Sequence, residues 1–476
     1  MRLTEPIETT GEFWLPEDPD TRLSGVLRIS ETGEVTAELA GVFGDPFSVI
    51  MKADSNSSAS VERGEPRLER IVGVVAQGGR ITLDKCILQS QNWQWPSGLS
   101  RSTVYASRAL IGASYEPAEE VSFSEFSLGV EGLDAWLGIT GIEIEQDAGI
   151  SGGLIRYRIP NEIPLTLPDG VGLKFVFQLV QSGNLAFLTE ARVKQTASVV
   201  LESEEPRNID YFSSTALRLC HFLSLALDQS VAIQSMTGNV NYETEDGEKH
   251  RYQVKVYGQF APWTEGKPVV NRHDALFLYH DVIGQLEQMI PRWFEGYEAL
   301  GPAFDLYFAS RTQTSLFLDT KVLLLAQALE TLHRRTTQET EMPEEDFANL
   351  LEMVTRNCPE TRREWVSGRL RYANELTFRH RIQRLLEPFG HHFGEGRART
   401  DFINKVCDTR NYLTHYDEKS TKNRASQPRE LFTIHGKLEA LFLLHLLRMI
   451  GLDAPSIDSM ARKNARLSRT SDNQVA

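Results

Sequence analysis

The sequence predicts an α+β protein of several domains, with an antiparallel, sandwich-like β-rich domain first, an α+β middle region next and an all-α bundle last. Three observations predict this order. The 476-residue length exceeds one ordinary domain. Short, partly alternating β-branched segments fill the first 200 residues, and helical periodicity dominates after Pro268. We place the domains at 1–203, 204–300 and 301–455, followed by a mobile basic tail at 456–476.

The composition is that of a folded protein whose charge is unevenly distributed. Hydrophobic residues make up 41% and charged residues 24%, which excludes wholesale disorder. The net charge of -15 argues against a general nucleic-acid coat protein, yet residues 361–476 hold 21 Lys and Arg against 13 Asp and Glu. A local basic region attracts a polyanion even when the whole chain is acidic. The alternative is an ordinary arginine-rich helical surface.

The cysteines and the N-terminus bear on the compartment. Cys86, Cys220, Cys358 and Cys407 lie far apart with no C-x-x-C pair, so neither a disulfide framework nor a zinc site is indicated. The first residues lack the basic and apolar pattern of a secretory signal, and no apolar run reaches 18 residues. We expect a cytoplasmic protein with no membrane contact and no cofactor.

The N-terminal strands follow from β-branched runs separated by turn residues. They are expected at 25–30, 34–40, 71–76, 80–88, 121–130, 141–145 and 154–159, with further strands between 163 and 200. An antiparallel sandwich or an open barrel follows, with a loop at 55–60. Trp93 and Trp95 would share one side of a strand, as an aromatic platform for a sugar or base. Packing in a core or at a sheet edge is the favoured interpretation.

The middle region combines a helix and a hairpin. Apolar residues at spacings of three and four predict a helix at 210–228, in which His221 is packed rather than bound to a ligand. Two alternating runs around Asp246-Gly247 predict a hairpin at 239–258.

The remaining chain is predicted to be helical. Helices are expected at 275–289 and 293–300, on either side of Pro291, which should end or kink the first of them. Asp319 and Asp401 are candidate N-caps. The His391-His392 pair lacks the i, i+4 spacing of a helical metal site, so no metal site is expected. The segment 431–450 is apolar on most sides, which indicates the centre of the bundle or a subunit interface. The expected helices lie at 319–336, 343–354, 362–386, 401–416 and 431–450, with a flexible joint at 391–396.

The segment 409–416, TRNYLTHY, carries the most informative chemistry. Arg410, Asn411 and His415 supply a guanidinium that forks onto phosphate, an amide that orients, and an imidazole that moves protons near neutral pH. On a regular helix His415 lies roughly 40° from Asn411 but roughly 140° from Arg410. The arginine's length must close that gap, or the helix unwinds near Thr414, or two copies of the motif face each other.

This motif resembles the R-x4-6-H signature of HEPN-superfamily ribonucleases. The helical C-terminal third, with ALETLHRR at 328–335 and TRNYLTHYDE at 409–418, resembles the ApeA-like HEPN proteins linked to bacterial defence against phage. The EFWLP start at 12–16 fits the N-terminal domain of that family.

The resemblance implies a metal-independent endoribonuclease with a composite site in a homodimer of HEPN bundles. Arg410, Asn411 and His415 would be catalytic, leaving a 2′,3′-cyclic phosphate and a 5′-hydroxyl. Glu330 would face the motif and pair with Arg410. RNA, with a tRNA anticodon loop as the candidate target, would be cut once a phage-derived trigger relieves restraint by the N-terminal region.

Several residues and rival functions complete these expectations. Tyr412 and Tyr416 would stack on unpaired bases, although packing is the favoured interpretation, and Thr414 lies between them and His415 as a supporting residue. One rival is a non-catalytic nucleic-acid- or ligand-binding scaffold whose bundle mediates dimerisation. The other is a carbohydrate- or ligand-binding enzyme centred on Trp93 and Trp95.

Overall fold

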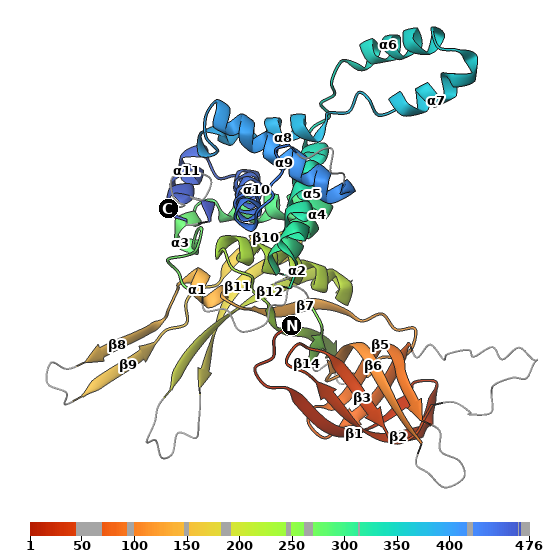
Figure 1. The fold of residues 1–476 in the computed structure, drawn as a ribbon. Coiled ribbons are helices and arrows are strands. Elements are labelled where there is room, and N and C mark those ends of the chain that lie inside the picture. The colour runs from red at the N-terminus through yellow and green to blue at the C-terminus, as the bar shows by residue number, and fades with distance from the viewer. Residues whose placement is uncertain are drawn as a thin grey trace, which may run out of the picture. The chain divides into compact units, whose positions relative to one another are not determined.

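The computed structural model divides the chain into two compact units, Met1–Ile283 and Gly284–Ala476 (Figure 1). This division differs from the predicted one, because residue 203 lies inside a long strand, β12 (Val193–Asn208), of the first unit. The structure describes residues 1–43, 69–92, 100–146, 152–181, 192–243, 249–260, 270–312, 315–416, 422–464 and 466–467. Trp93, Trp95 and the loop predicted at 55–60 lie outside these residues.

Among the described residues, the first six strands close into an antiparallel barrel. The strand order is β6-β3-β2-β1-β4-β5, and β5 pairs back to β6. The antiparallel β-rich prediction is confirmed, but the strands form a closed barrel rather than a sandwich or an open one. The bounds are β1 (Ile7–Leu15), β2 (Asp18–Ile29), β3 (Val35–Leu39), β4 (Arg70–Val75), β5 (Gly79–Asn92) and β6 (Arg101–Ile111).

Alternating side chains fill the barrel interior. Phe13, Leu27 and Ile81 are completely buried, and Phe13 and Leu27 each come from a strand whose neighbouring residues are more exposed. Alternation of this kind places every second residue on the inner face of a barrel strand. The barrel core therefore depends on the period-two pattern that predicted its strands.

The strand β6 joins the barrel to a second stretch of sheet. Its residues 102–106 pair with β3, and its residues 108–111 pair with β14. From β14 the sheet continues in the order β13, β7, β12, β11 and β10. The bounds are β7 (Ser122–Val130), β10 (Ile163–Thr166), β11 (Gly172–Gln181), β13 (Ile233–Glu243) and β14 (Lys249–Gly258), and a separate ladder pairs β8 (Ile142–Gln146) with β9 (Gly153–Tyr157).

The helix α2 (Ile209–Ala226) covers this second stretch of sheet. Asn208 ends β12 and begins the helix, because its side-chain oxygen accepts a hydrogen bond from the Tyr211 backbone N–H at 2.9 Å. Phe212 stacks on Phe126 of β7 at 4.5 Å between ring centroids. His221 is buried in α2, which agrees with its predicted packing role. The short helices α1 (Leu133–Leu137) and α3 (Tyr279–Val282) complete the unit.

The second unit is a helical bundle around α5 (Leu318–Thr336) and α10 (Pro428–Met449). The helix α5 contacts α4, α8, α9 and α10, while α10 contacts α4, α5, α9 and α11. Leu438, Leu441 and Leu444 are completely buried within the chain, so α10 is the centre of the bundle rather than an exposed subunit interface. The other helices are α4 (Leu286–Thr312), α8 (Phe378–Leu386), η1 (Glu387–His392), α9 (Arg397–His415) and α11 (Ala454–Lys463).

Two predicted features of this unit are wrong. The helices predicted at 275–289 and 293–300 are not separated at Pro291, which lies inside α4. This proline costs one backbone hydrogen bond near the start of the helix, while Ile290 and Trp293 beside it are buried. The helix predicted at 362–386 is two helices, α7 (Glu360–Leu370) and α8. Thr377 begins α8 by accepting a hydrogen bond from the His380 backbone N–H.

Helix ends and the C-terminus also differ from expectation. Asp319 and Asp401 lie inside helices that begin at Leu318 and Arg397, so neither is an N-cap. The predicted mobile tail is wrong at its start. There α11 forms because Asp453 caps it through the Ser456 backbone N–H and because two residues one turn apart, Ile457 and Ala461, are buried.

The helices α6 (Glu344–Arg356) and α7 lie against each other and form a hairpin, which we call the arm. Neither helix has a buried residue. The ends of the arm meet at a bridge between Thr340 and Glu375. Beside it, the buried Asn374 side chain accepts a hydrogen bond from Met342 N–H at 3.0 Å and donates one to Met342 C=O at 3.1 Å. These contacts between residues 340–342 and 374–375 form the neck of the arm. They hold the arm to the bundle, although the arm has no buried core.

Candidate active site

The helix α9 carries the Arg/His motif at its C-terminal end. It is anchored by Phe402, Val406 and Leu413, which are buried as the predicted stripe requires. The helix is regular through His415 and ends at Tyr416, whose backbone is left-handed (φ 50°, ψ 30°) and whose N–H donates to Tyr412 C=O at 2.6 Å. Unwinding near Thr414 is therefore not how the motif is completed.

Arg410 is held in place by three neighbours. Its guanidinium donates to Glu330 Oε2 at 3.3 Å and to Asn411 Oδ1 at 3.2 Å, and it lies 5.3 Å from the centre of the Phe378 ring. The Glu330 side chain is 19% exposed and that of Arg410 is 31% exposed. The arginine is thus oriented from the bundle side while part of it reaches solvent. An arginine in this setting is prepared to bind an incoming anion.

Glu330 also begins a chain of ion pairs across the bundle. Its Oε1 lies 3.4 Å from Arg334, which lies 2.5 Å from Glu375 at the neck of the arm. Glu375 in turn lies 3.8 Å from the buried Arg381. Arg381 contacts the His333 ring at 3.3 Å, and burial together with this arginine lowers the pKa of His333. Glu330, His333 and Arg334 belong to α5, whereas Glu375 and Arg381 come from a separate segment of the chain.

His415 is exposed at the last position of α9 and has no hydrogen-bond partner among the described residues. No hydrogen bond joins it to Arg410 in the described part of the chain. Asn411, four residues earlier, lies on the same face of the helix. The structure therefore brings together Arg410, Asn411 and Glu330, as predicted, and leaves His415 facing solvent.

The aromatic residues of the motif are arranged as a pair. The Tyr412 and Tyr416 rings lie 5.6 Å apart at 67°, and the Arg424 guanidinium lies 3.8 Å from the centre of the Tyr412 ring. Tyr416 is 68% exposed, so packing explains Tyr412 better than Tyr416. Thr414 donates its hydroxyl hydrogen to Arg410 C=O at 2.7 Å, which engages it with the helix backbone rather than with the site.

The segment between α9 and α10 is hydrogen-bonded to α9 just before Arg410. The Thr409 hydroxyl accepts from Ala425 N–H at 2.9 Å, and Asn423 donates to Asp408 at 3.0 Å. One turn earlier, Lys405 lies 2.7 Å from Glu430 and, with backbone N–H groups, lowers the pKa of Glu430 to about 2. These contacts fix the helix that presents Arg410 and Asn411.

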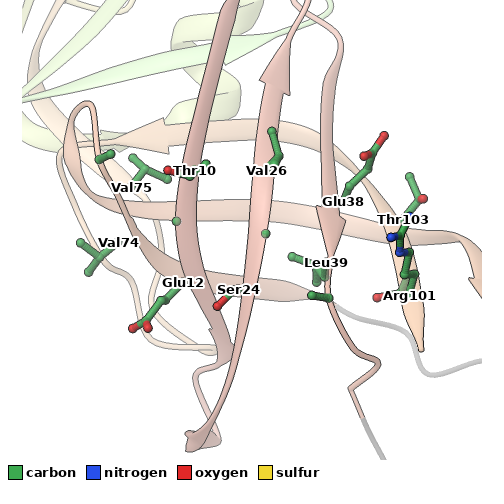
Figure 2. A pocket seen from close by; sticks show the side chains of 15 residues that line it. Thr10, Glu12, Ser24, Val26, Glu38, Leu39, Val74, Val75, Arg101 and Thr103 are labelled. Carbon is green, nitrogen blue, oxygen red and sulfur yellow. The ribbon is translucent and has the colours of Figure 1, made fainter. Parts of the chain in front are cut away.

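A separate hollow lies at the barrel and is lined by residues of β1, β2, β3, β4 and β6 (Figure 2). Its volume is about 960 Å³. At two of its lining positions, 11 and 25, the close approach of the neighbouring strand requires glycine, because a Cβ at either position would lie 2.6 Å from a backbone oxygen of that strand. Glu12, Glu38 and Arg101 are the charged residues in its lining, which contains neither histidine nor cysteine.

The comparisons with known families cover nearly the whole chain. Residues 8–293 match the family model described as ApeA N-terminal domain 1, and residues 323–456 match the Apea-like HEPN model. The second match includes Glu330 and the whole motif from Arg410 to Tyr416. No curated protein and no solved structure matches the chain. None of the described helices is both long and apolar enough to cross a membrane. The chain therefore belongs to the family of ApeA-like HEPN proteins.

Proposed function

We propose that the protein is a metal-independent endoribonuclease that acts in defence against phage. Membership of the HEPN family supports a nuclease of this kind. The observation that carries the proposal for this chain is the fixed Arg410, held by Glu330 and Asn411, on a regular helix that ends in the exposed His415. These are the groups that cleavage of an RNA phosphodiester needs.

In the proposed reaction the ribose 2′-hydroxyl attacks the adjacent phosphorus, and the bond to the 5′-oxygen breaks. His415 acts as general base toward the hydroxyl or as general acid toward the leaving oxygen. Arg410 binds the phosphate and stabilises the negative charge that grows in the transition state. Asn411 orients the arginine through its present hydrogen bond. The products are a 2′,3′-cyclic phosphate and a 5′-hydroxyl.

Two chains would complete the site. On a regular α9 the directions of Arg410 and His415 differ by roughly 140°, and Arg410 is already drawn toward Glu330. A homodimer in which the motifs face each other places Arg410 of one copy opposite His415 of the other. We propose structured RNA as the substrate class, with a tRNA anticodon loop as the target. The N-terminal unit would restrain the nuclease until a phage-derived molecule binds it.

The test incubates the full-length protein with total RNA and with tRNA in the presence of a chelator. We expect fragments ending in a cyclic phosphate, and a loss of at least about 100-fold in rate for Arg410→Ala or His415→Ala. The matched control is Arg397→Ala, which removes a 94% exposed arginine from the other end of the same helix. Cleavage that persists in His415→Ala overturns the assignment, and a strict requirement for divalent metal in protein that stays folded in the chelator, as circular dichroism measures, overturns the mechanism.

The ion pair of Arg410 with Glu330 also favours a second function, because a non-catalytic scaffold would need the same contact for stability. The same variants separate the two functions. A scaffold predicts intact RNA with the unmodified protein, together with loss of folding or of dimerisation in Arg410→Ala. A nuclease predicts a folded, dimeric Arg410→Ala protein that no longer cuts.

A further inference from the structure

Two neighbouring histidines and one aspartate converge on one point of the helical bundle. His391 and His392 end η1, and Asp458 lies on α11, more than sixty residues later in the chain. The Nε2 atoms of both imidazoles lie 2.9 Å from the same Asp458 oxygen, Oδ1. The two rings lie 4.0 Å apart between centroids. Three potential ligand atoms therefore lie within 4.8 Å of one another.

This spacing matches that of ligands around a single small cation. Two atoms bound about 2.1 Å from one ion, at angles between the octahedral and tetrahedral values, lie roughly 3.0 to 3.4 Å apart. The nitrogen-to-oxygen separations of 2.9 Å are close to that range, so small rotations of the side chains admit an ion. A single hydrogen bond to Asp458 needs only one imidazole, whereas this arrangement directs two at the same oxygen.

We propose that His391, His392 and Asp458 bind a divalent transition metal ion, with Zn²⁺ as the preferred ion. Imidazole nitrogens favour zinc and its neighbours over magnesium and calcium, which prefer sites built from oxygen alone. Three protein ligands leave a position for water, and the 56% exposed side chain of His391 gives solvent and ion access to the site. The nearby positive charge of Arg462 moderates the affinity.

The position of the site indicates a structural role. Only four residues separate His392 from the start of α9, and Arg399 fastens this connection by donating to Gly394 C=O at 3.1 Å. His415 lies at the other end of α9, roughly 27 Å along a helix axis that rises about 1.5 Å per residue. A bound ion would cross-link α11 to the segment that leads into α9. It would take no part in the proposed cleavage.

Metal binding is tested on the full-length protein, made without a polyhistidine tag and stripped with a chelator that is then removed. Titration with Co²⁺ should give one equivalent bound, with visible absorption bands that Zn²⁺ removes by displacement. Zn²⁺ should also raise the melting temperature. Asp458→Asn keeps a similar shape and removes the charge, and His391→Ala truncates an exposed ring; each should weaken Co²⁺ binding at least about tenfold.

The control for this experiment is His280→Ala, which removes an exposed histidine that lies 3.3 Å from a single aspartate, Asp281. Its Co²⁺ binding should equal that of the unmodified protein. The proposal fails if the unmodified protein binds no Co²⁺, or if Asp458→Asn and His391→Ala bind it as tightly as the control. The readout is bound metal rather than RNA cleavage, so its result stands whichever way the nuclease test falls.

Discussion

Glu330 is the residue on which the geometry of the candidate site depends most directly, because it is shared between Arg410 and Arg334. The sequence predicted Arg410, Asn411 and His415 from their spacing, and Glu330 only through the resemblance to the HEPN family. It did not reveal Phe378, Glu375 or Arg381. Phe378 and Arg381 lie on α8, which packs against α5 and α9, and Glu375 lies just before that helix; a contact between separate segments has no period that a sequence displays.

Glu330→Gln tests this positioning role. The amide keeps the shape but loses the charge that holds Arg410, so we expect the turnover number for RNA cleavage to fall by roughly 10- to 100-fold with a smaller change in KM. Steady-state kinetics on a defined RNA measure both constants. Glu339→Gln, which removes an exposed charge paired with Arg384 at 2.9 Å, is the control and should leave both unchanged. Equal effects of the two substitutions would refute a specific role for Glu330.

The buried imidazole of His221 should make the stability of the first unit depend on pH. Burial lowers its pKa from 6.5 to about 3 in the folded protein. As the pH falls below 6.5 the unfolded chain takes up a proton that the folded chain does not. The free energy of unfolding should therefore decrease by up to ~1.4 kcal/mol per pH unit between pH 6.5 and 3.

This effect is measured by denaturant unfolding of the protein and of His221→Leu at several pH values from 7 to 5. The leucine variant should show a flatter dependence because it cannot take up that proton. His273→Leu replaces an exposed histidine of the same unit and should keep the original slope. An unchanged slope in His221→Leu would mean that other groups govern the acid sensitivity.

At the scale of elements, alternation and helical periodicity predicted most strands and helices. They failed where packing against neighbouring segments, or a capping residue, determines whether the element forms. The strands β1 and β6 escaped prediction because Gly11 and the run of small residues in β6 weaken the pattern, although both strands are fixed by neighbours on two sides. The helix α11 escaped because two buried side chains, Ile457 and Ala461, are too few to show a period.

The structure of the arm predicts that it can be deleted without unfolding the second unit. Because α6 and α7 bury no residue and their ends meet at the bridge between Thr340 and Glu375, a short Gly/Ser linker can replace residues 343–373. We expect the shortened protein to stay folded, with a melting temperature of the second unit within a few degrees of the original. Circular dichroism and calorimetry measure this. A control that instead deletes α11, which has buried residues, should destabilise the unit clearly.

At the scale of the whole molecule, the proposed dimer makes a prediction about mixtures. If Arg410 of one chain works with His415 of the other, a heterodimer of Arg410→Ala and His415→Ala contains one intact site. Mixing the two inactive variants in equal amounts under conditions of subunit exchange should restore about a quarter of the original cleavage rate, since half of the dimers are mixed and each has one site of two.

Cleavage of RNA with cyclic phosphate ends measures this recovery, and each variant mixed with itself is the control. No recovery, in a mixture shown by native mass spectrometry to contain heterodimers, would place both groups of each site on one chain. The sequence could not decide whether each site is built by one chain or by two. The angle between Arg410 and His415 follows from helix geometry, whereas the position of a second chain depends on which surface of the folded bundle it contacts.

Closure of the barrel by the pairing of β5 with β6 limits how the barrel can recognise another polypeptide. In the described residues, every strand from β1 to β6 has a hydrogen-bonded neighbour on both sides. Along these paired residues an extended peptide finds no open edge on which to add as a further strand, and the same pairing protects them from edge-to-edge aggregation. A polypeptide that binds the barrel there must be recognised through side-chain contacts and surface shape. Its amino-acid sequence, rather than its capacity to form a strand, would then determine binding.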